Sequence, residues 1–485
     1  MPERPNIVFI LADDLGWRDP SCYGSAFYET PNLDRLAREG VRFTDAYAAC
    51  PVCSPTRASL LTGQYPAHVG VTDYIDVSGK THPCKGRLID APYVDHVPDT
   101  HATYAHALRD AGYQTWHVGK WHCGGEGSLP HQRGFEVNLG GCAHGAPTRP
   151  AGYFAPWDLP DPALRQANAT VEPGTYLDDY LTDRAVELIE NRDPDRPFLL
   201  NLWHYLVHTP LQAPEPLVKK YEAKAKRMKL DAIDPVVPGE PFPSRHEADQ
   251  RIQRRVVQSH PTYAAMVELM DHCIGRVLRA LDDAGVADET LVVFTSDNGG
   301  LSTAEGSPTC NHPLSEGKGW MYDGGTREPY IVRLPGVTEP GTTCRTPITS
   351  PDLYPTLLEA AGLDARPEQH TDGVSFLPAL KGDAGFDRGG VFWHYPHYGN
   401  QGGTPSAAVR HGPWKLLRFF EDDRFELYHL GDDVSESRDV SADHPERVEE
   451  LAAELEAWQR RMGARFPEPN PDYVHPTHPA ADPAV

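Results

Sequence analysis

The sequence has no apolar run of about 18 residues, the length that a membrane-spanning helix needs. We therefore expect no membrane partner. Positive charge is also scarce, with 45 Lys and Arg against 69 Asp and Glu and a formal net charge of −24. This balance disfavours a general electrostatic attraction to nucleic acid or anionic lipid. An excess of acidic residues is typical of soluble proteins, and an anionic substrate would require positive charge that is local to its site.

Cysteine is too infrequent and too irregularly spaced for a disulfide framework. The chain has nine cysteines in 485 residues, an odd number, and small disulfide-stapled domains have far denser and more regular patterns. Most of these thiols are expected to be reduced.

The N-terminal apolar run, residues 7–12, is too short for the core of a signal peptide, and acidic residues follow it directly. We expect a cytoplasmic location for the chain as written, or a periplasmic or secreted one if a signal segment was removed.

Strand-like apolar runs alternate with helical patterns over most of the chain. The runs NIVFILA, YQTWHVG, FLLNLWHY and LVVFTSD are nearly continuous in apolar residues, and helical segments lie between them. This pattern predicts an α/β fold with a large, mostly parallel sheet sandwiched by helices. In such folds ligands bind beyond the carboxyl ends of the strands.

The pattern changes after about residue 375. GGVFWHYP, AVRHGPWKLLRFF and RFELYHL are typical of antiparallel strands, and a polar helix is expected from Pro445 to Arg461 before a proline-rich tail. We predict a large domain over residues 1–375 and a smaller C-terminal α+β domain with an antiparallel sheet over residues 376–485. A prior of roughly 150 residues per domain is compatible with one large domain and a smaller one.

Two long segments, 124–175 and 230–250, have little regular pattern. They are either surface loops or walls of a substrate cleft. The basic run KKYEAKAKRMK at 219–229 is expected to be the solvated face of a helix.

Oxygen-bearing side chains follow two of the predicted strands directly. Asp13 and Asp14 end the first strand, and Asp297 and Asn298 end the strand LVVFTS. Either pair alone is explained by a turn, because Asp and Asn favour turns at strand ends. Both pairs at one edge of a parallel sheet favour a hard divalent cation such as Ca²⁺ or Mg²⁺.

Basic and imidazole side chains occur in motif-like surroundings. A site for a tetrahedral anion needs cationic donors aimed at its oxygens and a group that protonates the leaving oxygen. The candidates are Arg57, Lys120, His122, His208 and Lys318. The other histidines are interpreted as ordinary surface or core residues.

Cys53, in CSPTRAS, has three interpretations on its own. It is a buried thiol, a redox partner of Cys50 in a C-x-x-C spacing, or the precursor of a modified residue. Neither the buried-thiol nor the redox-partner interpretation explains the neighbouring Pro55 and Arg57.

Taken together, these motifs resemble the type I, formylglycine-dependent sulfatases, arylsulfatase A-like members of the alkaline-phosphatase superfamily. The resemblance extends from about residue 5 to residue 335. It rests on six motifs in the family's order: FILADDLGW, CSPTR, GKWH, HTPLQ, TSDNGG and GKGWMYDGGTREP. It implies that a formylglycine-generating enzyme converts Cys53 to formylglycine, whose hydrated aldehyde is the nucleophile.

The resemblance also implies a role for each candidate. Asp13, Asp14, Asp297, Asn298 and an oxygen at position 53 would bind one Ca²⁺ ion. Asp297 would be the base that activates the nucleophile, and Arg57 would hold the nucleophile and Lys120. Lys120, His208 and Lys318 would bind the sulfate, with either His208 or Lys318 as the acid for the leaving group. His122 would accept the proton whose removal releases sulfate.

One departure from the family pattern is Cys123, where an aliphatic residue is common, and a second thiol near the site is therefore expected.

We predict from the resemblance an exo-acting hydrolase of a sulfated sugar. Two alternatives remain: a phosphonate monoester or phosphodiester hydrolase of the same superfamily, and a non-catalytic binder of sulfated glycans. The aromatic segment 392–403, FWHYPHYGNQGG, either contacts the sugar or packs as a strand of the C-terminal domain. The sequence does not determine the oligomeric state.

Overall fold

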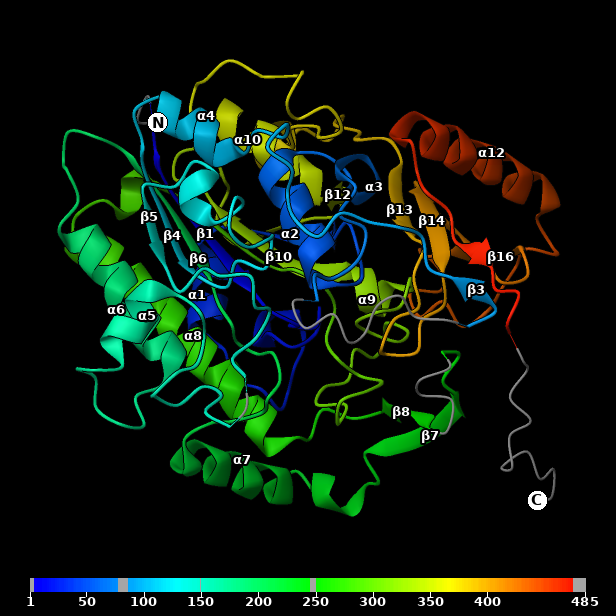
Figure 1. The fold of residues 1–485 in the computed structure, drawn as a ribbon, viewed down its shortest axis with the longest axis horizontal. Coiled ribbons are helices and arrows are strands. Elements are labelled where there is room, and N and C mark those ends of the chain that lie inside the picture. The colour runs from blue at the N-terminus through cyan, green and yellow to red at the C-terminus, as the bar shows by residue number, and fades with distance from the viewer. Residues whose placement is uncertain (1–3, 77–85, 149, 245–249, 474–485) are drawn as a thin grey trace.

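The computed structural model describes residues 4–76, 86–148, 150–244 and 250–473 (Figure 1). Its strands in the main sheet are β1 Asn6–Ala12, β2 Val41–Tyr47, β4 Gln114–Gly119, β5 Val137–Leu139, β6 Phe198–Trp203, β9 Thr290–Ser296, β10 Arg327–Arg333, β11 Thr342–Cys344 and β12 Ile348–Thr349. Within these ranges the sheet has nine strands in the order β11-β2-β10-β9-β1-β6-β4-β5, with β12 paired to β2.

The centre of this sheet is parallel. β1 runs parallel to both β6 and β9, and β4 runs parallel to β6 and β5. β10 is antiparallel to its two neighbours, β2 and β9. Every residue of β1, β6 and β9 is buried, as expected for strands covered on both faces. The predicted fold class is confirmed.

Helices cover both faces of the sheet (Figure 1). They are α1 Pro31–Glu39, α2 Cys53–Thr62, α3 Pro66–Val69, α4 Tyr104–Asp110, α5 Pro162–Ala167, α6 Leu177–Glu190, α7 Glu215–Arg227, α8 Pro261–Asp283, α9 Asp323–Thr326, α10 Leu353–Ala360, α11 Leu377–Leu380 and α12 Pro445–Met462. Shorter 3-10 helices lie at Ser21–Tyr23, Pro130–Gln132, Leu230–Ala232, Ala287–Glu289 and Ser350–Asp352.

The alternation of side chains along β1 builds two separate cores. Val8, Ile10 and Ala12 pack in one core with residues of α6 and α8. Ile7 and Phe9 point to the opposite face and pack in a second core with residues of α2, α4 and α10. Successive residues of a strand face opposite sides of a sheet, so a continuous apolar strand supplies both cores at once.

The C-terminal part contains the expected antiparallel sheet. Its strands are β13 Val391–Tyr395, β14 Ser406–His411, β15 Trp414–Phe419 and β16 Arg424–His429, paired in that order. α12, predicted from Pro445 to Arg461, packs on this sheet through Leu451, Leu455 and Trp458. Residues 474–485, within the predicted proline-rich tail, lie outside the described residues.

The C-terminal sheet packs directly against the segment that leads into α2. The Trp393 indole donates a hydrogen bond to the Ala48 carbonyl at 2.8 Å, and its ring contacts that of Tyr47. The boundary at residue 375 stays a prediction.

The two segments without a sequence pattern contain some regular structure. Segment 124–175 includes β5 and α5, and Phe154 pairs with Tyr176 in an isolated bridge. Segment 230–250 forms β7, Val236–Pro241, which pairs antiparallel with β8, Arg251–Arg255. The prolines and glycine of VVPGEP concealed this strand, because they are unfavourable inside a sheet but are tolerated in a two-stranded ribbon. A further short pair joins β3, Leu88–Ile89, to β17, Glu468–Pro469.

The basic run lies mainly on α7, and its lysines are solvated or pair with glutamates. Lys219 pairs with Glu215, and Lys220 pairs with Glu29 at 2.6 Å. Among the described residues, no helix is both long enough and apolar enough to cross a bilayer. The eight cysteines in these ranges are all free thiols.

Candidate active site

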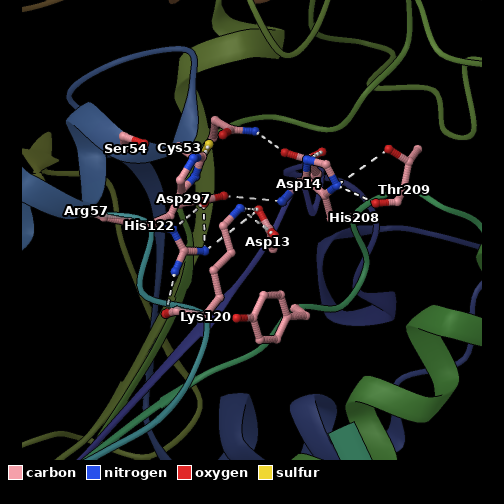
Figure 2. Close-up of polar contacts among 12 residues, drawn as sticks. Asp13, Asp14, Cys53, Ser54, Arg57, Lys120, His122, His208, Thr209 and Asp297 are labelled. Carbon is pink, nitrogen blue, oxygen red and sulfur yellow. Dashed lines mark hydrogen bonds and ion pairs between the residues drawn. The ribbon is translucent and has the colours of Figure 1, made fainter. Parts of the chain in front are cut away.

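The predicted site residues meet at the carboxyl ends of four neighbouring strands. Asp13 and Asp14 follow β1, and Asp297 follows β9. Lys120 follows β4, and His208 lies in the loop after β6. Because β9, β1, β6 and β4 are adjacent in that order, these segments come together at one edge of the sheet. Figure 2 shows their side chains turned toward a common centre.

Cys53 is the first residue of α2, the helix that follows β2 in the chain. The preceding residue, Val52, is extended, and Pro55 in the first helical turn is compatible with a helix because that turn needs no backbone donors. Arg57 lies one turn after Cys53 and therefore on the same face of the helix. All ten residues of α2 are buried, and Cys53 is 3% exposed. The position of Cys53 is thus fixed by core packing.

Each of the three buried carboxylates is paired with a buried cation. Lys120 Nζ donates to both oxygens of Asp13, at 2.7 and 2.8 Å. Arg57 Nε donates to Asp297 Oδ2 at 2.8 Å. These four side chains are fully buried, so each charge would be costly without its partner.

The third pair is Lys318 with Asp14, where Nζ donates to Oδ2 at 2.8 Å. Burial opposes ionisation of Asp14, but Lys318 and His208 hold the pKa of this carboxyl below its ordinary value. The formal charges of the three carboxylates and the three cations in these pairs sum to zero.

The oxygen atoms around Asp14 fit a hard divalent cation. Asn298 Nδ2 donates to Asp14 Oδ1 at 2.8 Å, whereas the buried Oδ1 of Asn298 has no hydrogen-bond partner among the described residues. Asp14 itself has a positive φ of 62°, and its amide donates to Asp297 Oδ1 at 3.2 Å. An unpartnered buried acceptor beside three carboxylates is the donor set that Ca²⁺ prefers.

Proximity alone also groups His208 with Asp13 and Asp14, since one potential ligand atom of each lies within 4.8 Å of the others. An imidazole nitrogen is a poor ligand for Ca²⁺, so Asn298 and Asp297 fit such an ion better than His208. The structure thus brings acidic groups together in a way that could bind a metal.

His122 presents an unprotonated nitrogen to Cys53. Its Nε2 lies 2.8 Å from the carbonyl oxygen of Ile75, which can only accept, so Nε2 carries the hydrogen. The other nitrogen, Nδ1, then has a free lone pair 3.2 Å from Cys53 Sγ. Burial, together with the charge of Lys120, lowers the pKa of His122 well below its ordinary value. The ring is therefore a neutral base beside position 53.

His208 and Lys318 form a hydrogen-bonded pair, and Figure 2 places His208 across Asp14 from Cys53. His208 Nδ1 donates to the carbonyl oxygen of Thr209 at 2.7 Å. Its Nε2 therefore accepts from Lys318 Nζ, 3.1 Å away. Burial, and next the charge of Lys318, lower the pKa of His208 to about 4.

The remaining cysteines near the site are structural thiols. Cys123 is fully buried in the core that contains Trp121 and Trp203, and burial raises its pKa. Cys50 and Cys53 are both free, and burial raises the pKa of each thiol. A redox C-x-x-C motif requires a lowered thiol pKa, so this interpretation is disfavoured.

Two residues beside the site were not predicted. Thr209 Oγ1 donates to Glu305 Oε2 at 3.0 Å, which places Glu305 next to His208. Thr209 lies inside the HTPLQ motif, beside His208, but a threonine at that place is not by itself a sign of a functional residue. Glu305 lies in an irregular loop, where no periodicity marks it.

The two interpretations of segment 392–403 apply to different parts of it. Residues 392–395 are a buried part of β13 and pack in the C-terminal core. Asn400, in contrast, lines a cavity together with Glu305.

Comparison with known proteins assigns the family. The model of the sulfatase domain matches residues 5–363, a range that includes every residue of the site. The chain belongs to the sulfatase family. As a member of this family, the protein is a sulfuric ester hydrolase. A second model, the C-terminal domain of N-sulphoglucosamine sulphohydrolase, matches residues 315–462.

Relatives of the sulfatase family match most of the chain. A sulfatase of Formosa agariphila is 32% identical over 94% of this chain and 89% of its own length. Human arylsulfatase A is 33% identical over 86% of this chain and 75% of its own. The crystal structure of Ps i-CgsB in complex with k-i-k-neocarrahexaose is 28% identical, covers 98% of this chain and 95% of that one, and has a TM-score of 0.73.

Proposed function

We propose that this protein is an exo-acting carbohydrate sulfatase that uses formylglycine at position 53 and one bound Ca²⁺ ion. The observation that carries the proposal is the position of Cys53 at the start of α2, 3.2 Å from a neutral imidazole and beside three buried carboxylates. A sugar substrate is supported by the name of the C-terminal family model and by the neocarrahexaose complex of a structural relative.

In this proposal Asp13, Asp14, Asp297 and Asn298 hold the metal ion, together with an oxygen at position 53. When bound, the ion neutralises sulfate oxygens, and the hydrated formylglycine provides the attacking hydroxyl. With the six paired charges summing to zero, a divalent cation gives the site a net charge of about +2. An anionic sulfate ester would then be attracted to a site on an otherwise acidic protein.

Asp297 is proposed as the base for the attacking hydroxyl. Arg57 holds Asp297 Oδ2 and also donates to the carbonyl oxygen of Lys120 at 3.2 Å. The guanidinium lies 5.3 Å from the centre of the Trp203 ring, which supports it from the core side. Arg57 therefore fixes both the base and the segment that carries Lys120, and its contact with the nucleophile stays part of the proposal.

Lys120, His208 and Lys318 are proposed to bind the sulfate group. The hydrogen-bond directions favour Lys318 as the proton donor to the leaving oxygen, because His208 Nε2 accepts a hydrogen bond and has no proton to give. His208 would then orient the Lys318 ammonium.

The motifs alone are compatible with either a sulfate ester or a phosphorus ester as substrate. The match to the sulfatase family model supports a sulfate ester. A non-catalytic glycan binder is disfavoured by the complete set of acid, base and cationic groups.

The proposal is tested by ion-chromatographic detection of sulfate released from sulfated mono- and disaccharides and from 4-nitrophenyl sulfate. The protein is co-expressed with a formylglycine-generating enzyme, and mass spectrometry confirms conversion of Cys53. We expect sulfate from at least one sugar. Hydrolysis of phosphonate or phosphodiester substrates without any sulfate release would contradict the proposal, as would ligand binding without hydrolysis.

Replacement of His122 should separate ester cleavage from sulfate release. In His122→Ala the site loses the base beside position 53, so we expect the first turnover to proceed and later turnovers to slow by on the order of 100-fold or more. A stopped-flow burst of about one equivalent of product should appear, and intact mass should show one retained sulfate group. Rapid multiple turnovers would exclude this role. His117→Ala, on β4 five residues before His122 and packed against Trp121 in the core, is a control that should show no burst.

A further inference from the structure

A cavity of about 600 Å³ has Glu305 in its lining, and Glu305 is hydrogen-bonded to Thr209, the neighbour of His208. Its lining includes Thr303, Glu305 and Asn400 on the site side, and Gln253 and Arg251 from β8. This volume suits one or two sugar rings, and amide and hydroxyl side chains are suitable partners for sugar hydroxyls. The β7–β8 ribbon, which the sequence pattern did not predict, forms the outer wall.

Glu305 carries a negative charge at the boundary between this cavity and the sulfate-binding residues. Its carboxylate accepts hydrogen bonds from Thr209 Oγ1 at 3.0 Å and from Gln401 Nε2 at 3.1 Å. Both donors tether the side chain, although the residue is exposed to solvent. The charge therefore has a fixed position despite its exposure.

The position of Glu305 is close to the proposed proton donor. Glu305 is hydrogen-bonded to Thr209, the residue next to His208, and His208 Nε2 lies 3.1 Å from Lys318 Nζ. A substrate whose sulfate is held by His208 and Lys318 would thus place its neighbouring substituents against Glu305.

We infer that Glu305 is a specificity-determining residue that selects the substituent beside the scissile sulfate ester. A hydroxyl or ammonium group can donate to the carboxylate, whereas a second sulfate or a carboxylate is repelled by it. The inference rests on the proposed function and narrows its substrate class to sugars without an anionic group next to the ester. Arg251, the other charged residue of the lining, lies on the β8 wall, where it can receive a more distant anionic group.

The test compares Glu305→Gln with the unchanged enzyme on matched sugars. One sugar is the monosulfated member of the panel that the enzyme hydrolyses, and the others carry an ammonium or a second sulfate on the neighbouring carbon. We expect Glu305→Gln to increase kcat/KM for the disulfated sugar, relative to the monosulfated one, by roughly five- to tenfold. The ratio for the ammonium sugar should fall by a similar factor.

Three controls distinguish the effect of the Glu305 charge from other effects of the substitution. Glu305→Asp keeps the charge and should leave both ratios within about twofold of the original. Glu339→Gln makes the same charge change at an exposed position beyond β10, at the opposite edge of the sheet, and should alter neither ratio. Activity on 4-nitrophenyl sulfate, which has no substituent beside the ester, is measured in every variant as the reference for general effects on the site, and Glu339→Gln should leave it unchanged.

The outcomes distinguish the inference from the function on which it rests. Unchanged ratios in Glu305→Gln, with sulfate still released from sugars, would overturn the inference alone. Equal shifts in Glu339→Gln would also overturn it, since the effect would then come from net charge. Absence of sulfate release from every sugar would overturn the proposed function, and the inference with it.

Discussion

Cys53→Ala is expected to abolish sulfate release, lowering kcat by on the order of 10⁵-fold or more under conditions in which the converted enzyme is active. The reason is that alanine cannot be converted to formylglycine, and among the described residues position 53 alone places a nucleophile beside His122 Nδ1. The surrounding cations would still bind a sulfate ester. The substitution should therefore affect kcat far more than the dissociation constant of the substrate, measured by calorimetry.

The comparison requires that the variant folds. Cys53 lies in the first turn of a buried helix, and the change removes only one sulfur atom, so we expect a destabilisation of roughly 1 kcal/mol. Cys50→Ala, three residues earlier and equally buried, is the matched control and should retain activity. Residual turnover in Cys53→Ala, or an equal loss in Cys50→Ala, would rule out position 53 as the nucleophile.

Removal of Ca²⁺ by a chelator is expected to lower sulfatase activity by at least about 100-fold, and added CaCl₂ should restore it. Without the ion, Asp13, Asp14 and Asp297 are balanced only by Arg57 and two lysines, so the site has no net positive charge to hold a sulfate. The lysines also stay bound to carboxylates instead of facing the substrate. Activity should therefore follow the occupancy of the metal site.

Calcium binding should also stabilise the fold. An ion that binds only the folded protein stabilises it by about 2.7 kcal/mol at a concentration of 100 times its Kd, which corresponds to a rise of a few degrees in Tm by calorimetry.

Asn298→Ala removes a buried oxygen that has no hydrogen-bond partner among the described residues, and it should raise the Ca²⁺ concentration needed for half-maximal activity by roughly 10- to 100-fold. Asn400→Ala, at the cavity, is a control that should leave the Ca²⁺ requirement unchanged. Full activity in chelator, with no change in Tm on adding calcium, would exclude a functional metal at Asn298.

The pattern of the sequence predicted the architecture well because a parallel sheet leaves a strong imprint. NIVFILA supplies residues to two cores at once, so it must be apolar throughout, and the same is true of β6 and β9. The β7 strand left no such imprint, because among the described residues it pairs with β8 alone, in a ribbon, and contains two prolines.

The sequence predicted which residues gather at the candidate site, but not which of them pair with each other. Asp14 and Asp297 follow strands that a sequence-based prediction can place at one sheet edge, yet the sequence does not show that Lys318 binds Asp14 or that Arg57 binds Asp297. Those pairings depend on how loops of different length fold over the sheet. The protonated nitrogen of His122 is similarly set by a distant carbonyl, that of Ile75.

The sequence by itself determined the sheet, the family motifs and the chemical groups of the site, because burial and catalysis each restrict residue type at fixed spacing. Only the tertiary structure decided the balance of three carboxylates against three cations, the direction of the hydrogen bonds at His122 and His208, and the position of Glu305. The physical reason is that Coulomb energy and hydrogen bonding act between atoms a few ångströms apart, whereas the residues involved lie up to hundreds of positions apart in the chain.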